Sequence, residues 1–142
     1  MASVASPPPP PLTLAGEHVL LLWQVTARTE ELLAAVDQGR WPAAELAALA
    51  SSARAEVLRQ ASDEETLLFP GTRTADTARL ARDHARLRAA AELLARVATG
   101  EQPLSRAQVA TFARDFVTQL KRHLRAEESL LAVQGPVSQG RL

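Results

Sequence analysis

Apolar residues recur at alternating steps of three and four along four long segments of the chain, the spacing typical of amphipathic helices. These segments run from residue 13 or 14 to about 38, from 41 to about 68, from 74–76 to just before 100, and from 105 to about 133. No segment shows the strict alternation expected of a half-buried strand. Four amphipathic helices joined by short loops predict an all-α fold, an up-down-up-down antiparallel four-helix bundle.

Glycine, proline and capping residues mark the predicted helix ends. Gly39 supplies a stop after the first helix, and Pro42 is well tolerated in the first turn of the second. The sequence Phe-Pro-Gly-Thr at 69–72 breaks the chain before the third helix. Ser105 is expected to cap the fourth helix, with Gln108 as its capping-box partner.

Both ends of the chain have compositions that disfavour a packed structure. Residues 1–12 contain a run of prolines at 7–11, which lack amide donors and have a fixed φ, so this segment is predicted to be disordered. Residues 134–142 begin with Gln-Gly-Pro and are predicted to form a flexible tail. The expected organisation of the 142 residues is therefore one helical domain at 13–133 with two flexible ends.

Polar residues interrupt each of the four apolar stripes. They are His18 in the first, Gln60 and Glu64 in the second, His84 in the third, and His123 and Glu127 in the fourth. Antiparallel packing places the starts of the first and third helices beside the ends of the second and fourth. All six polar residues are thus expected to meet at one level of the bundle, where residues at i and i+4 reach the same point.

The chemistry of these residues favours a metal site. A buried histidine or carboxylate without a partner costs on the order of several kcal/mol, and a divalent cation would satisfy both types at once. All three histidines of the chain lie on the apolar stripes. The chain has no cysteine, which excludes disulfides, thiolate zinc sites and iron–sulfur clusters and leaves imidazole and carboxylate ligands. Such ligands suit iron, manganese or zinc.

An internal repeat relates the two halves of the chain. Each half has an acid followed by histidine, then a ligand pair with a second glutamate: Glu17-His18 with Gln60-x-x-x-Glu64-Glu65, and Asp83-His84 with His123-x-x-x-Glu127-Glu128. A helical hairpin that is repeated, with each copy contributing ligands to a central site, suits a dinuclear centre inside a bundle.

The order of these motifs resembles the hemerythrin-like, or HHE cation-binding, domain family, most specifically at 64–70, Glu-Glu-Thr-Leu-Leu-Phe-Pro. The resemblance covers about residues 14–133. It implies a four-helix bundle with a non-haem di-iron centre that binds oxygen or responds to oxygen, nitric oxide, peroxide or iron supply. Carried over by position, the metal ligands are His18, Glu64, His84, His123 and Glu127, with the glutamates as candidate bridges between two irons.

The sequence departs from the family pattern in two places. Gln60 stands where the family has histidine, and Leu80 stands where some members carry an additional histidine. Several outcomes follow for the centre: Gln60 ligates through its oxygen, a neighbouring acid or water fills the position, the site holds a single ion, or metal binding is lost and the polar residues are hydrogen-bonded to one another. The neighbouring acids are Glu65, Asp83 and Glu128.

Charge and hydropathy exclude several other functions. The formal net charge is zero, with 16 basic and 16 acidic residues, so nucleic acid is not an expected partner. The arginines at 79, 82, 86 and 88 are interpreted as a solvated face. The apolar runs are too short to span a bilayer and no signal peptide is evident, so we expect no membrane association and a cytoplasmic location.

The sequence thus predicts a metal-binding, hemerythrin-like protein that binds or senses oxygen, nitric oxide, or redox or iron state. Its expected partner is a small diatomic or peroxide ligand. No phosphate-binding loop or nucleophilic serine motif accompanies the histidines and glutamates, so an enzyme is not expected. The alternative is a degenerate, metal-free helical bundle that serves as an interaction or regulatory domain.

Overall fold

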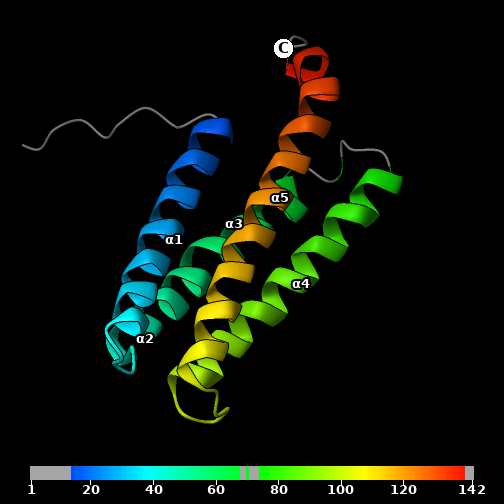
Figure 1. The fold of residues 1–142 in the computed structure, drawn as a ribbon. Coiled ribbons are helices and arrows are strands. Elements are labelled where there is room, and N and C mark those ends of the chain that lie inside the picture. The colour runs from blue at the N-terminus through cyan, green and yellow to red at the C-terminus, as the bar shows by residue number, and fades with distance from the viewer. Residues whose placement is uncertain (1–13, 68–69, 71–73, 140–142) are drawn as a thin grey trace, which may run out of the picture.

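A computed structural model of the chain describes residues 14–67, 70 and 74–139. These residues form a bundle of helices (Figure 1) and include no strand. The elements are α1 (Leu14–Asp37), α2 (Ala43–Ser52), a π-helical turn η1 (Ala53–Val57), α3 (Leu58–Leu67), α4 (Thr74–Ala98) and α5 (Arg106–Gln139). The all-helical bundle predicted from the apolar stripes is confirmed.

The predicted helix boundaries hold where glycine or a capping box marks them. Gly39 and Gly100 follow α1 and α4 with φ of 77° and 84°, a conformation that glycine adopts without the steric cost of a side chain. At the start of α5 the Ser105 hydroxyl accepts from the amide of Gln108 at 3.1 Å. The Gln108 side chain in turn accepts from the Ser105 amide at 2.8 Å, which completes the capping box.

The second predicted helix is not one uninterrupted α-helix. It contains the π-turn η1, in which the amide of Leu58 donates to the carbonyl of Ala53, five residues earlier. A π-turn inserts one residue into the helical repeat, and such turns are frequent beside functional sites. Here it ends just before Gln60 and Glu64. The apolar stripe gave no sign of it, because the step of four residues from Ala53 to Val57 fits a turn of either helix type.

The fourth helix continues beyond its predicted end. α5 runs to Gln139, through Gly135 and Pro136, whereas the prediction ended the helix at about 133 because both residues disfavour helix. The predicted disordered segment at 1–12 lies outside the described residues. Of the predicted break at 69–72, the structure describes only Pro70.

The helices pack around a core formed by the predicted apolar stripes. α1 contacts α2 and α5, and α4 contacts the same two helices from the opposite side of the bundle. Fully buried members of the core include Val25, Leu32, Leu49, Ala91 and Phe116. Arg106 at the start of α5 donates to the carbonyl of Gly39, which places the end of α1 beside the start of α5.

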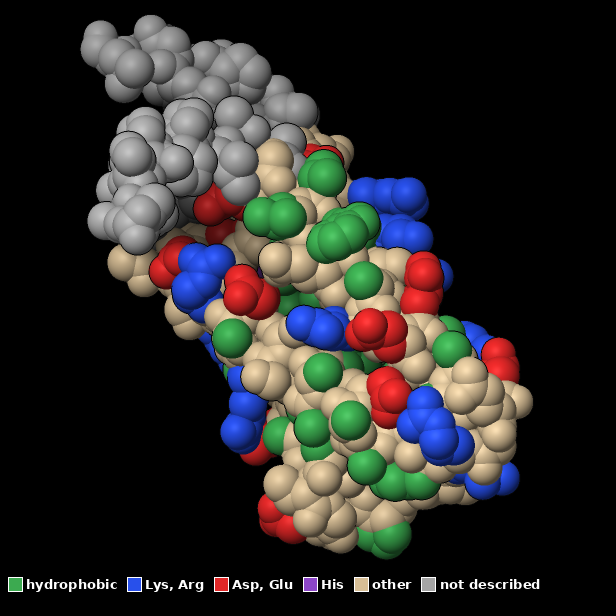
Figure 2. Space-filling model, turned by 90° about the vertical axis from the view of Figure 1, so that its left-hand side faces the viewer, with side chains coloured by type: hydrophobic (Ala, Val, Ile, Leu, Met, Phe, Trp, Pro, Cys, Tyr) green, Lys and Arg blue, Asp and Glu red, His purple; other side chains and the backbone are tan. Residues whose placement is uncertain are grey.

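Charged side chains of both signs lie intermixed on the face shown in Figure 2, and no histidine is visible there. This agrees with the burial of His18, His84 and His123, which are 1%, 0% and 3% exposed. Among the described helices, none combines the length and apolar character needed to cross a membrane.

Candidate metal centre

The five predicted ligands come together inside the bundle, each buried. α1 contributes His18, α3 Glu64, α4 His84, and α5 both His123 and Glu127. Their exposed fractions do not exceed 3%. The prediction that the polar positions of the four stripes meet at one level is therefore confirmed, while their role as metal ligands stays a prediction.

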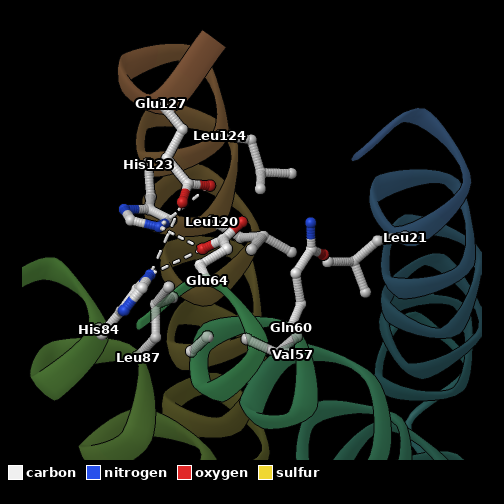
Figure 3. Close-up of a pocket in the computed structure, with 11 residues that line it drawn as sticks. Leu21, Val57, Gln60, Glu64, His84, Leu87, Leu120, His123, Leu124 and Glu127 are labelled. Atoms are coloured by element: carbon white, nitrogen blue, oxygen red, sulfur yellow. Dashed lines mark hydrogen bonds and ion pairs between the residues drawn. The ribbon is translucent and has the colours of Figure 1, made fainter. Parts of the chain in front are cut away.

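Four of the five form a compact group, Glu64, His84, His123 and Glu127, in which one potential ligand atom of each lies within 4.8 Å of the others. Figure 3 shows these side chains pointing toward one another. Glu64 Oε1 lies 2.9 Å from His84 Nε2, and Glu127 Oε1 lies 3.3 Å from His123 Nε2. Two imidazoles and two carboxylates thus face one small volume, the kind of ligand set that binds first-row metals.

His18 contacts the same two carboxylates but does not belong to the compact group. Its Nε2 lies 3.4 Å from Glu64 Oε2 and 3.4 Å from Glu127 Oε1. Glu64 therefore presents one oxygen to His18 and the other to His84. A carboxylate with its two oxygens directed at different histidines has the disposition of a bridging ligand.

Each histidine is held from behind by a second carboxylate. Nδ1 lies 3.0 Å from Glu128 Oε2 in His18, 2.8 Å from Glu65 Oε2 in His84, and 3.1 Å from Asp83 Oδ2 in His123. A proton on Nδ1 that is donated to the carboxylate fixes the ring and leaves the Nε2 lone pair directed inward. The sequence offered these three acids as alternative ligands, whereas the structure places them behind the histidines.

Arg88 extends one of these contacts into a chain. Its guanidinium donates to both oxygens of Glu65, at 3.0 and 2.8 Å, and Glu65 in turn contacts His84. The two Arg88 hydrogen bonds are the main cause of the lowered pKa of Glu65. Arg88 was interpreted as part of a solvated basic face, and its side chain is 38% exposed, but its guanidinium also supports the centre through Glu65. Sequence spacing could not reveal a pair that joins α3 to α4.

Without a cation, the cluster balances its charges with protons. Burial by itself would lower the pKa of His84 and of His123, but the surrounding carboxylates, Glu127 and Glu64 foremost, raise these values to about 9 and about 10. Burial would likewise raise the pKa of Glu64, but its contacts with His123, His18 and His84 lower it instead. A bound cation would take over the charge of these protons and displace them.

The buried polar atoms fit a cation. His123 Nε2 and Glu127 Oε1 are both buried, and neither has a hydrogen-bond partner among the described residues, although the two atoms lie 3.3 Å apart. When a cation displaces the Nε2 proton of His123 and Nδ1 keeps its proton toward Asp83, both atoms offer lone pairs. A positive ion between them then satisfies both atoms at once.

Gln60 and Leu80 occupy the two positions where the sequence departs from the family pattern. Gln60 lies on α3 one turn before Glu64 and is 8% exposed, and within the described part of the chain its Nε2 has no hydrogen-bond partner. Leu80 is buried on α4 and is 4% exposed.

The hemerythrin HHE cation-binding domain matches residues 12–133 of the chain. The chain belongs to this family. No curated protein and no solved structure matches the chain. For a hemerythrin-family domain, the buried group of Glu64, His84, His123 and Glu127 indicates cation binding.

Proposed function

We propose that this hemerythrin-family protein holds a non-haem di-iron centre through His18, Glu64, His84, His123 and Glu127. The observation that carries the proposal is the buried group of two imidazoles and two carboxylates whose ligand atoms lie within 4.8 Å of one another. Iron accepts imidazole and carboxylate ligands, and the chain has no thiolate that would favour zinc or an iron–sulfur cluster.

The contacts of the two glutamates support a centre with two ions. Glu64 directs Oε2 to His18 and Oε1 to His84, and Glu127 directs Oε1 to His18 and Oε2 to His84. Both carboxylates thus span the space between a histidine of α1 and a histidine of α4. Such a position suits carboxylates that bridge two irons, as di-iron bundles use glutamates from facing helices.

The function we propose is binding or sensing of oxygen, nitric oxide, or redox or iron state, without catalytic turnover. Iron would supply reversible, redox-linked binding of a small diatomic or peroxide ligand. The chain would supply the fixed imidazoles, the bridging carboxylates and the surrounding apolar core, which keeps bulk water from the centre. The expected cytoplasmic location and the up-down-up-down helix order belong to this proposal. The Arg106–Gly39 and His18–Glu128 contacts support opposite directions for α1 and α5.

A second candidate is a metal-free helical domain with an interaction or regulatory role. One observation favours it: the raised pKa values of His84 and His123, about 9 and about 10, let protons neutralise the buried glutamates at neutral pH. The bundle can therefore balance its internal charge without a metal.

Metal analysis of the purified protein, together with its visible spectrum under air, separates the two candidates. The di-iron proposal expects about two irons per chain and oxo-bridge charge-transfer bands. A colourless protein that takes up no metal during anaerobic iron loading would overturn it in favour of the metal-free domain.

A further inference from the structure

A small cavity borders the cluster inside the bundle, with lining residues from α1, η1, α3, α4 and α5. Its volume is about 10 Å³, close to the space that one water molecule requires. Leu21, Leu120 and Leu124 contribute apolar walls, and Gln60 lines the cavity together with the cluster glutamates (Figure 3). The cavity therefore has room for an occupant of very few atoms beside the centre.

Unpartnered polar atoms gather at this cavity. Five buried side-chain atoms in the described part of the chain lack a hydrogen-bond partner, and three of them belong to residues that line it: Gln60 Nε2, His123 Nε2 and Glu127 Oε1. A cation accounts for the last two, because both offer lone pairs. It cannot account for Gln60 Nε2, which is a proton donor with no lone pair to give.

We propose that Gln60 Nε2 donates a hydrogen bond to a small ligand that carries lone pairs and occupies this cavity beside the iron. The inference rests on the proposed function and names the residue that recognises its ligand. The cavity size limits the ligand to one or two heavy atoms, which nitric oxide, dioxygen and water satisfy. The apolar walls formed by Leu21, Leu120 and Leu124 leave Gln60 as a polar group that can orient such a molecule.

The internal repeat shows what the glutamine changes. Gln60 corresponds to His123, whose Nδ1 is held by Asp83 at 3.1 Å. The residue that corresponds to Asp83 in the first half is Glu17, which is exposed. A histidine at 60 would offer a lone pair to the iron, whereas the amide of Gln60 offers a proton to whatever binds there. Glutamine in place of histidine at position 60 therefore replaces a residue that would bind the metal with one that we predict donates a hydrogen bond to the bound small molecule.

Nitric oxide binding to the iron(II)-loaded full chain tests this role, with Gln60→Met as the variant and Gln102→Met as the matched control. Methionine keeps the length of glutamine without its donor, and Gln102 lies exposed in the loop after α4. We expect equal iron content in all three proteins. Loss of one hydrogen bond should raise the nitric oxide dissociation constant about tenfold in Gln60→Met only, with a shift in the N–O stretching frequency.

The outcomes separate this inference from the proposed function. Unchanged nitric oxide affinity and N–O frequency in iron-replete Gln60→Met overturn the inference and leave the di-iron proposal standing. Loss of iron from Gln60→Met shows that the glutamine ligates iron through its oxygen, which also overturns it. A wild-type chain that binds no iron overturns both. Gln60→Leu, which buries an apolar side chain of similar size, serves as the second variant if Gln60→Met does not fold.

Discussion

The two halves of the internal repeat differ in the contact between an acid and the residue that it would hold on the second helix of the hairpin. In the half formed by α4 and α5, Asp83 holds His123 through Nδ1 at 3.1 Å. In the half formed by α1 to α3, the corresponding acid, Glu17, is exposed. The corresponding ligand position holds Gln60, whose buried Nε2 has no hydrogen-bond partner among the residues that the structure describes. Glutamine at position 60 thus removes a predicted metal ligand. It also leaves the corresponding acid, Glu17, without a histidine to support.

The contacts that support His18 and His84 correspond to each other and run between the halves. Glu65 of the first half supports His84 of the second, and Glu128 of the second half supports His18 of the first. Each half therefore depends on the other for the orientation of its histidine. The comparison teaches that the centre belongs to the pair of hairpins and that it is asymmetric in two places. Gln60 stands where the second half has His123, and Leu22 stands where the second half has Arg88, which supports Glu65.

The largest effect is expected from His123→Ala. This substitution removes the histidine of the second half whose counterpart in the first half is Gln60. Glu127, Glu64 and Asp83 would lose a shared positive partner, and breaking such a buried pair costs about 3–5 kcal/mol. We expect both the iron content and the Tm to fall, the latter by roughly 10 °C. Metal analysis and thermal unfolding measure the change, with exposed Lys121→Ala as the control. Iron content equal to that of the wild type would show that the centre lies elsewhere.

The second effect concerns pH, and it tests the two histidines of the α4–α5 half. Their pKa values are raised from 6.5 to about 9 in His84 and about 10 in His123. Because the folded protein binds protons more tightly than the unfolded chain, this stabilisation is fully present below pH 6.5 and is lost as the pH rises through 9 and 10.

We therefore expect the metal-free protein to have a lower free energy of unfolding at pH 10 than at pH 7, measured by urea titration. The iron affinity is expected to change in the opposite direction and to rise with pH. Iron must displace the same protons, and these are held less firmly at higher pH. Iron uptake in weakly buffered solution should release protons. Metal-free stability that is constant from pH 7 to pH 10 would contradict the charge balance described for the cluster.

A third prediction compares the two acids of the repeat directly. Asp83→Asn removes the carboxylate that holds His123, and loss of such a supporting contact weakens metal binding about 10–100-fold. Glu17→Gln, the same change at the corresponding exposed position, should leave the iron dissociation constant unchanged. Competition with a chelator measures both constants. Equal losses in the two variants would mean that the halves are functionally alike and that the exposed Glu17 has a role.

The smallest expected effect is a gain, from Gln60→His. A histidine at this position would restore the missing ligand of the first half and raise iron affinity by up to about tenfold. Glu17→Gln should then weaken iron binding in the Gln60→His background, although it has no effect in the wild type. A double-mutant cycle of iron dissociation constants measures this coupling. Additive effects would show that Glu17 cannot reach a histidine at position 60.

Much of the fold followed from the sequence because burial imposes the helical period. Val25, Leu49, Ala91 and Phe116, one apolar residue from each of the four predicted helices, are all buried. The π-turn at Ala53–Val57 was not predicted, since a step of four residues between apolar positions fits both an α-helical and a π-helical turn. The continuation of α5 through Pro136 was likewise missed, because proline was taken to end the helix.

For the centre, the sequence by itself determined which residues would be brought together. His18, Glu64, His84, His123 and Glu127 each occupy a core position of a helix, and a polar residue in the core must find its partners among the others. The spacing along each helix fixed the level at which they meet. The positions of these residues along each helix, together with the helical period, were therefore sufficient to predict which side chains meet.

Only the tertiary structure decided which acid supports which histidine. Asp83 precedes His84 in the chain but contacts His123, while His84 contacts Glu65 on another helix. Adjacent residues on a helix point in different directions, so an acid beside a histidine in sequence faces a different neighbour in space. The same packing places the amide of Gln60 at the small cavity. These contacts depend on how the helices lie against one another, which the pattern along each helix does not specify.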